Sequence, residues 1–91
     1  MATGNLISVN SLTPTLITPS GIHSGVDLTI YNQGSSGQII YIGGANVSSA
    51  NYGVKLSTGE GFGLSVPPRD EVYVIAAADT VSVSVLTLGL P

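Results

Sequence analysis

The sequence predicts an all-β fold, a small antiparallel β-sandwich or flattened barrel of about six to eight strands with an extended N-terminal arm. Three observations predict it. Apolar residues recur with a period of two almost throughout, as in strands that bury one face. Breaks rich in Gly, Pro, Ser and Asn separate these stretches every 8 to 12 residues or so, a spacing typical of sandwiches and barrels. No stretch shows the 3.6-residue period of an amphipathic helix.

The first twelve residues differ in kind from the rest of the chain. The segment MATGNLISVNSL consists mainly of small and polar residues, with Leu6, Ile7 and Leu12 as its branched apolar side chains. It is either a first edge strand or an extended arm that lies on a neighbouring molecule. The 91 residues suffice for one domain only, so we divide the chain into this segment at 1–12 and a single β-sandwich domain at 13–91.

Most of the expected strands have one apolar face. In VDLTIYN (26–32) and GFGLSV (61–66), apolar residues occupy every second position. In TVSVSVLTL (80–88), valines alternate with other residues until Leu86 and Leu88 change the phase, which predicts a bulge or the end of the buried stretch. The predicted strands span residues 6–10, 14–18, 26–32, 38–43, 53–56, 61–66, 71–77 and 81–88.

Two of these strands are apolar or aromatic on both faces. They are QIIYIG (38–43) and EVYVIAA (71–77). A strand of this kind is typical of the centre of a sheet that is covered on both sides. We therefore expect central strands, or strands whose second face meets a partner.

The glycines of GEGFG (59–63) raise the question of a phosphate-binding loop. Such a loop leads into the N-terminus of a helix and usually has a lysine close by. Here a strand ended by prolines follows, and the carboxylate of Glu60 would repel phosphate. We interpret STGEG (57–61) as a hairpin turn with glycines at positive φ, and Gly63 as lying opposite a bulky neighbour on the adjacent strand.

Charged side chains are rare in this chain. They make up 8% of the residues, where a typical soluble chain has about 25%. The surface must therefore consist mainly of neutral polar residues and some exposed apolar groups, a composition that favours association. We expect a subunit whose surface is largely covered in an assembly. The charged residues are Asp27, Lys55, Glu60, Arg69, Asp70, Glu71 and Asp79.

The composition disfavours several classes of function. Two basic residues and a net charge of −3 disfavour nucleic-acid binding. No apolar run has the length of a membrane span, and the first residues lack the basic and long apolar segments of a secretory signal. The chain has no cysteine and one histidine, and its carboxylates lack ligand spacing, so we expect neither metal nor cofactor.

Catalytic residue types do not form a recognisable constellation, so we expect no enzyme. His23 lies near serines and Asp27 in a short polar segment, and we interpret it as a surface or subunit-contact residue. Asp70 and Glu71 are adjacent at the start of the strand expected at 71–77, and neighbouring side chains in extended backbone point to opposite faces, which argues against an acid–base pair. With Arg69 they predict a surface or inter-subunit ion pair instead.

The tyrosines leave a binding alternative open. A set of exposed rings can form a sugar-binding platform, but strand tyrosines more often cover the rim of a core or an interface. We favour the second interpretation, with glycan binding as the less favoured one. The tyrosines are Tyr31, Tyr41, Tyr52 and Tyr73.

Most of the chain resembles small virion proteins of tailed bacteriophages. A strand of the type V-Y-I/L-G-G-x-x-V matches residues 40–47, and G-x-x-L-x-x-G-E matches 53–60. A strand of the type D-E-V/L-Y-x-I-A-A matches 70–77, and a valine-alternating strand matches 81–86. The resemblance covers 26–88 and includes no catalytic residue. It implies a structural protein of the virion, of the head-decoration or capsid-stabilising type.

The resemblance and the sparse charges together predict a homotrimer on the outer capsid surface. Its partners would be the major capsid protein and itself, and it would assemble in the cytoplasm of the bacterial host. A head–tail connector or tail subunit and a glycan- or receptor-binding β-module are the alternatives. The residues that we expect to make partner contacts are Leu6, Ile7, Leu12, Tyr41, Arg69, Glu71 and Tyr73.

Overall fold

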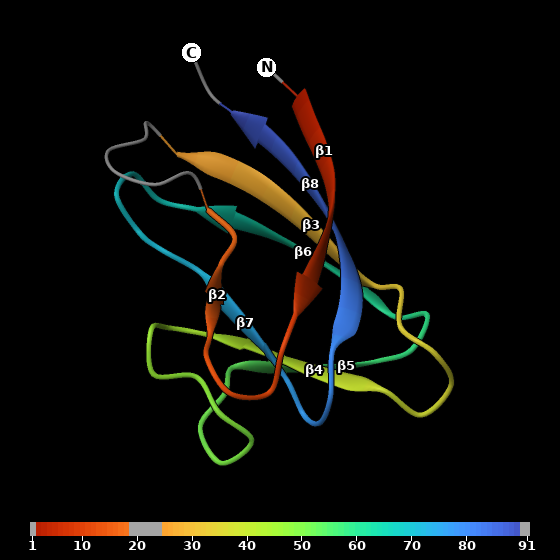
Figure 1. Cartoon of the computed structure of the whole chain (residues 1–91). Helices are drawn as coiled ribbons and strands as arrows, with labels where there is room; N and C mark the ends of the chain where they lie inside the picture. The colour runs from red at the N-terminus through yellow and green to blue at the C-terminus, as the bar shows by residue number, and fades with distance from the viewer. Residues whose placement is uncertain (1, 19–24, 90–91) are drawn as a thin grey trace.

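The computed structural model describes residues 2–18 and 25–89, whose regular structure is entirely β (Figure 1). These residues form two four-stranded sheets, in the orders β1-β8-β3-β6 and β2-β7-β4-β5. The predicted all-β sandwich is therefore confirmed. Within the described ranges, no helix is long and apolar enough to cross a membrane. The strands are β1 Ala2–Val9, β2 Thr15–Leu16, β3 Val26–Asn32, β4 Ile39–Gly43, β5 Val54–Ser57, β6 Gly61–Val66, β7 Tyr73–Ala76 and β8 Val81–Gly89.

The connectivity is that of a jelly roll. All strand pairs are antiparallel. Among the described strands, every connection crosses from one sheet to the other except the β4–β5 hairpin. Two four-stranded sheets with this alternation are the double Greek key of jelly-roll domains. Strands that follow one another in the sequence therefore seldom pair, and most neighbours in a sheet are far apart along the chain.

Residues 2–9 form an edge strand rather than an arm. β1 pairs with β8 over its whole length, with Ile7 opposite Val83 and Val9 opposite Val81. Val9 is fully buried and Ile7 packs against the core, because alternate residues of β1 face the opposite sheet. The chain turns out of this sheet at Asn10, whose Oδ1 accepts the backbone N–H groups of Leu12 and Thr13 at 2.9 and 2.8 Å.

The core lies between the two sheets and is made of their inward-facing aliphatic side chains. Its largest fully buried members include Leu28 and Ile30 from one sheet and Ile40 from the other. The alternation read from the sequence accounts for this arrangement, since β3 alternates buried and exposed residues throughout. The buried cluster contains Val9, Val26, Leu28, Ile30, Ile40, Ile42, Leu56, Val66, Val74, Ala76, Val81, Val83 and Val85.

The two strands that are apolar on both faces, β4 and β7, are paired at the centre of the second sheet. The β4–β5 loop covers part of their outer face. The ring of Tyr52 in this loop lies 4.6 Å from that of Tyr41 between centroids, and a Cβ on Gly43 would lie 3.1 Å from a methyl group of Val47. Val47 is itself buried. The second apolar face thus meets a segment of the same chain.

Candidate functional site

The outer face of the β1-β8-β3-β6 sheet alternates large and small side chains. The register places Ser84 between Leu6 and Tyr31, and in the next row Leu86 lies opposite Gly4. Leu6 is 69% exposed, and Tyr31 and Leu86 are each 42% exposed. Between the large side chains lies an open groove of about 450 Å³. It is lined by Gly4, Leu6, Thr29, Tyr31, Gln33, Ser84, Val85 and Leu86.

Leu88 extends this surface along β8. It is 44% exposed and lies on the same face as Leu86. We call Leu6, Tyr31, Leu86 and Leu88 the outer patch. Asp27, on β3 beside Leu88, is the only charged residue among the four strands of this sheet, and its Oδ1 accepts a hydrogen bond from Ser65 Oγ at 2.8 Å.

The chemistry of this surface suits contact with another neutral surface. The polar residues that line the groove are Thr29, Gln33 and Ser84, none of which is charged. In the part of the chain that the structure describes, no three His, Cys, Asp or Glu side chains gather as a metal site would require. His23 lies outside the described residues. The exposed surface of the outer patch is therefore mainly apolar.

The sequence contains one signal for the outer patch, and its interpretation is right in part. The change of phase at Leu86 and Leu88 predicted a bulge or the end of the buried stretch. The bulge is wrong, because β8 pairs without interruption with β1 and β3. The end of the buried stretch is confirmed, since Val85 is buried whereas Leu86 and Leu88 are exposed. The leucines instead occupy the outward positions that Ser82 and Ser84 hold earlier in the strand. Tyr31 and Gly4 carried no comparable signal.

Two of the expected contact residues from the first segment are exposed. Leu6 belongs to the outer patch, and Leu12 is 89% exposed at the turn between β1 and β2. Ile7 is different, since it points inward and packs against the core. It contributes to the sandwich rather than to an exposed surface.

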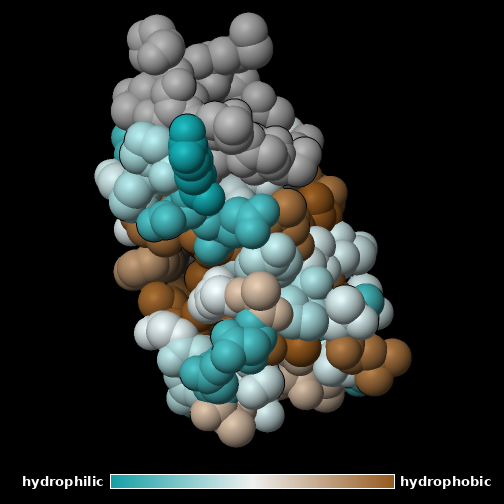
Figure 2. Space-filling view, turned by 90° about the vertical axis from the view of Figure 1, so that its left-hand side faces the viewer, coloured by the Kyte–Doolittle hydropathy of each residue, from teal (hydrophilic) through white to brown (hydrophobic). Residues whose placement is uncertain are grey.

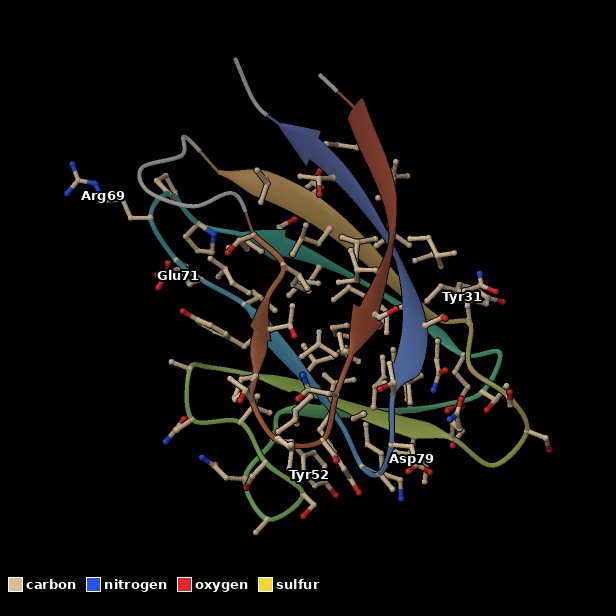
Figure 3. All side chains as sticks on the ribbon, in the orientation of Figure 1. Tyr31, Tyr52, Arg69, Glu71 and Asp79 are labelled. Carbon is tan, nitrogen blue, oxygen red and sulfur yellow. The ribbon has the colours of Figure 1, made fainter. Side chains whose placement is uncertain are left out.

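The other expected contact residues lie elsewhere on the molecule. Tyr41 and Tyr73 are half-buried on the outer face of the second sheet. Arg69 and Glu71 are exposed on the β6–β7 loop, and Figure 3 shows them on the side of the molecule opposite to Tyr31. Figure 2 views this loop side, where teal hydrophilic groups cluster below the grey atoms and again lower down, with brown apolar and pale surfaces between them. The structure therefore does not gather the predicted residues into one site.

The segment STGEG is a turn, as predicted, but it is not a hairpin. Gly59 has a φ of 83°, and the N–H of Glu60 donates to the carbonyl of Ser57 at 3.0 Å. The strands that it joins, β5 and β6, belong to different sheets. The prediction for Gly63 also needs correction. Gly61 is the glycine opposite a bulky side chain, since a Cβ there would lie 2.6 Å from the ring of Tyr31.

Comparison with known proteins gives a fold likeness. No family model matches the sequence. No curated protein matches it either. Among solved structures, the chain is similar to one described by the words "Bacillus endospore appendages form a novel family of disulfide-linked pili", with a TM-score of 0.50 and 18% identity. The match covers 100% of this chain and 88% of that one, and at this identity it shows a shared fold alone.

Proposed function

We propose that the chain is a structural subunit of a tailed-phage virion and binds the outer capsid surface as a head decoration or stabilisation protein. The observation that carries the proposal is the outer patch, an exposed apolar surface on strands almost free of charge. Monomeric proteins rarely keep such surfaces in water unless they serve as interfaces. The resemblance of residues 26–88 to small virion proteins supplies the setting.

The placement of the few charges supports an assembly role. Lys55 lies on β5 of the second sheet, and Arg69 and Asp79 lie in loops. β1 and β8 have no charged residue, so a neutral surface can cover them without desolvating an ion. Burial of apolar area stabilises contacts by about 25 cal/mol per Å², so each copy would add a modest contribution. Repeated over a shell, these contributions would strengthen the capsid.

The fold likeness favours a second candidate, a subunit of a filament. The similar structure is described as a pilus, so this jelly roll can serve in an extended assembly. Those pili are described as disulfide-linked, whereas the 91 residues here contain no cysteine. A filament of these residues would therefore form without disulfide bonds between them.

Capsids that lack this chain provide the test. Particles from a phage deletion strain should regain the purified chain on co-sedimentation and should then release DNA at a higher temperature. Leu86→Ser should weaken binding, because it removes apolar area from the outer patch. Tyr52→Ser, which removes an exposed ring outside the patch and outside the expected contact residues, should bind normally. Absence of binding to the capsids would contradict decoration, and filaments of the purified chain in electron micrographs would favour the second candidate.

Trimerisation, a connector or tail position and glycan binding stay predictions. The Tyr41–Tyr52 ring pair is the group to test for glycan binding, by titrating the purified chain with polysaccharide from the host surface.

A further inference from the structure

The free edge of β1 differs from the other sheet edges. The described sheets end at β1, β6, β2 and β5, so these strands have one edge without a described neighbour. β2 has only two residues, β5 contains Lys55, and β6 follows Glu60 and ends before Pro67. β1 has eight residues, with neither charge nor proline. Long neutral edges are the ones that pair with other chains, because charges and prolines normally prevent this pairing.

Two residues of β1 have complementary shapes on the outer face. Leu6 projects from this face and is 69% exposed. Gly4 lies two residues earlier on the same face, and a Cβ at this position would meet nothing within 4 Å. β1 therefore presents a projecting side chain, Leu6 (the knob), beside an open space above Gly4 (the hole). Gly4 and Leu86 both line the groove.

An antiparallel pair of β1 strands matches the knob to the hole twice. If Leu6 of one copy lies opposite Gly4 of the other, the twofold axis places the second Leu6 opposite the second Gly4. Residues opposite one another on antiparallel strands have Cβ atoms about 4.5–5.5 Å apart. Each Leu6 would then cover the partner's Gly4 and reach toward its Leu86. The register with Leu6 opposite Leu6 would leave both holes empty.

We propose that the occupant of this edge is β1 of a second copy, paired antiparallel with Leu6 opposite Gly4. The pair would join two four-stranded sheets into one continuous sheet with the outer patches on one side. Addition of a strand to a free sheet edge is an established mode of recognition, in which main-chain hydrogen bonds provide affinity and side-chain fit provides register. The inference rests on the geometry of β1 and is independent of the phage setting. A twofold contact gives a dimer rather than the trimer predicted from the sequence.

The first experiment measures the mass of the purified chain in solution by sedimentation equilibrium over a series of concentrations. We expect twice the 9.2 kDa of one chain at the higher concentrations. Leu6→Lys should return the mass to that of the monomer, because each of the two paired β1 strands would then place a positive charge close to that of the other. Leu12→Lys, also at an exposed leucine but outside the strand, should leave the dimer intact. A wild-type monomer at every concentration would overturn the proposal.

The second experiment tests the register and uses the absence of cysteine from the chain. The single variants Leu6→Cys and Gly4→Cys are mixed and oxidised, and circular dichroism confirms that each is folded. We expect a disulfide-linked dimer in the mixture and none in either variant alone, because opposite positions on paired strands satisfy disulfide geometry. A linked dimer in Leu6→Cys alone, or none in the mixture, would overturn the register. Amide hydrogen exchange of β1 gives a further check. If the N–H groups of β1 exchange slowly only when a capsid is added, the edge has a different occupant and the proposal is overturned.

Discussion

The side-chain amide of Asn32 donates a hydrogen bond to the backbone carbonyl of Leu56 over 3.0 Å and thereby ties β3 to β5 in the opposite sheet. The same amide donates to the carbonyl of Gln38 at 3.1 Å, and its Oδ1 accepts the N–H of Gly34 at 2.8 Å. Asn32 is almost completely buried. Every buried side-chain polar atom in the described residues has a partner, and Asn32 provides the link between the sheets at this end.

Replacement of Asn32 should therefore be costly. Asn32→Ala leaves the Leu56 carbonyl without its side-chain donor and the Gly34 N–H without its acceptor, whereas the Gln38 carbonyl keeps a donor in Thr58 Oγ1. We expect a loss of about 2–4 kcal/mol in the free energy of unfolding. Urea denaturation measures this loss. Ser36→Ala, in the exposed loop that follows, is the control and should change stability by less than about 0.5 kcal/mol. Equal urea midpoints for Asn32→Ala and Ser36→Ala would show that the side-chain hydrogen bonds of Asn32 do not stabilise the sandwich.

Gly34 should tolerate no side chain, for a steric reason. A Cβ at this position would lie 2.8 Å from Cγ1 of the buried Val81 and 3.0 Å from Oδ1 of Asn32. Gly34→Ala should destabilise the fold by about 1–3 kcal/mol, as overpacking does elsewhere. Gly44→Ala, where the nearest heavy atom would be 3.8 Å away, is the matched control. Thermal unfolding of both variants separates strain at this site from a general effect of glycine replacement.

Two leucines distinguish the core from the surface. Leu28 is 1% exposed between the sheets and Leu12 is 89% exposed at the β1–β2 turn. Leu28→Ala should cost about 2–5 kcal/mol through lost burial and the cavity left behind. Leu12→Ala should stay within about 0.5 kcal/mol of the parent. A large effect of Leu12→Ala on the isolated chain would mean that this leucine packs against something in solution.

The Tyr41–Tyr52 ring pair should stabilise the β4–β5 loop. The two rings are tilted by 37° with centroids 4.6 Å apart, a favourable arrangement for aromatic pairs. A double-mutant cycle with Tyr41→Ala and Tyr52→Ala should give a coupling energy of about 0.5–1.5 kcal/mol. Additive effects of the two substitutions would show that the rings contribute separately.

The strands were predictable because their physical cause is local. Alternation along VDLTIYN and GFGLSV placed β3 and β6 at their observed bounds, since a strand buried on one face needs an apolar residue at every second position. The expected strands at 14–18 and 71–77 are shorter, as Thr15–Leu16 and Tyr73–Ala76, because pairing and not apolar content determines where a strand ends.

The arrangement in space was less predictable because it depends on contacts between distant segments. Nothing in STGEG indicates that the turn passes between sheets, and the choice of Gly61 over Gly63 as the residue beneath Tyr31 follows from the β3–β6 register. Ile7 faces inward for the same reason, since its phase is fixed by pairing with β8. The outer patch joins residues from β1, β3 and β8, so no single stretch of sequence displays it.

A decoration protein covers a capsid in many copies. Quantitative mass spectrometry of the purified virion, with the chain counted against the major capsid protein, tests it most directly. We expect a ratio near one copy per capsid subunit. A ratio of roughly a hundredth would place the chain at the connector or tail, and absence of the chain from the particle would contradict a structural role in the virion.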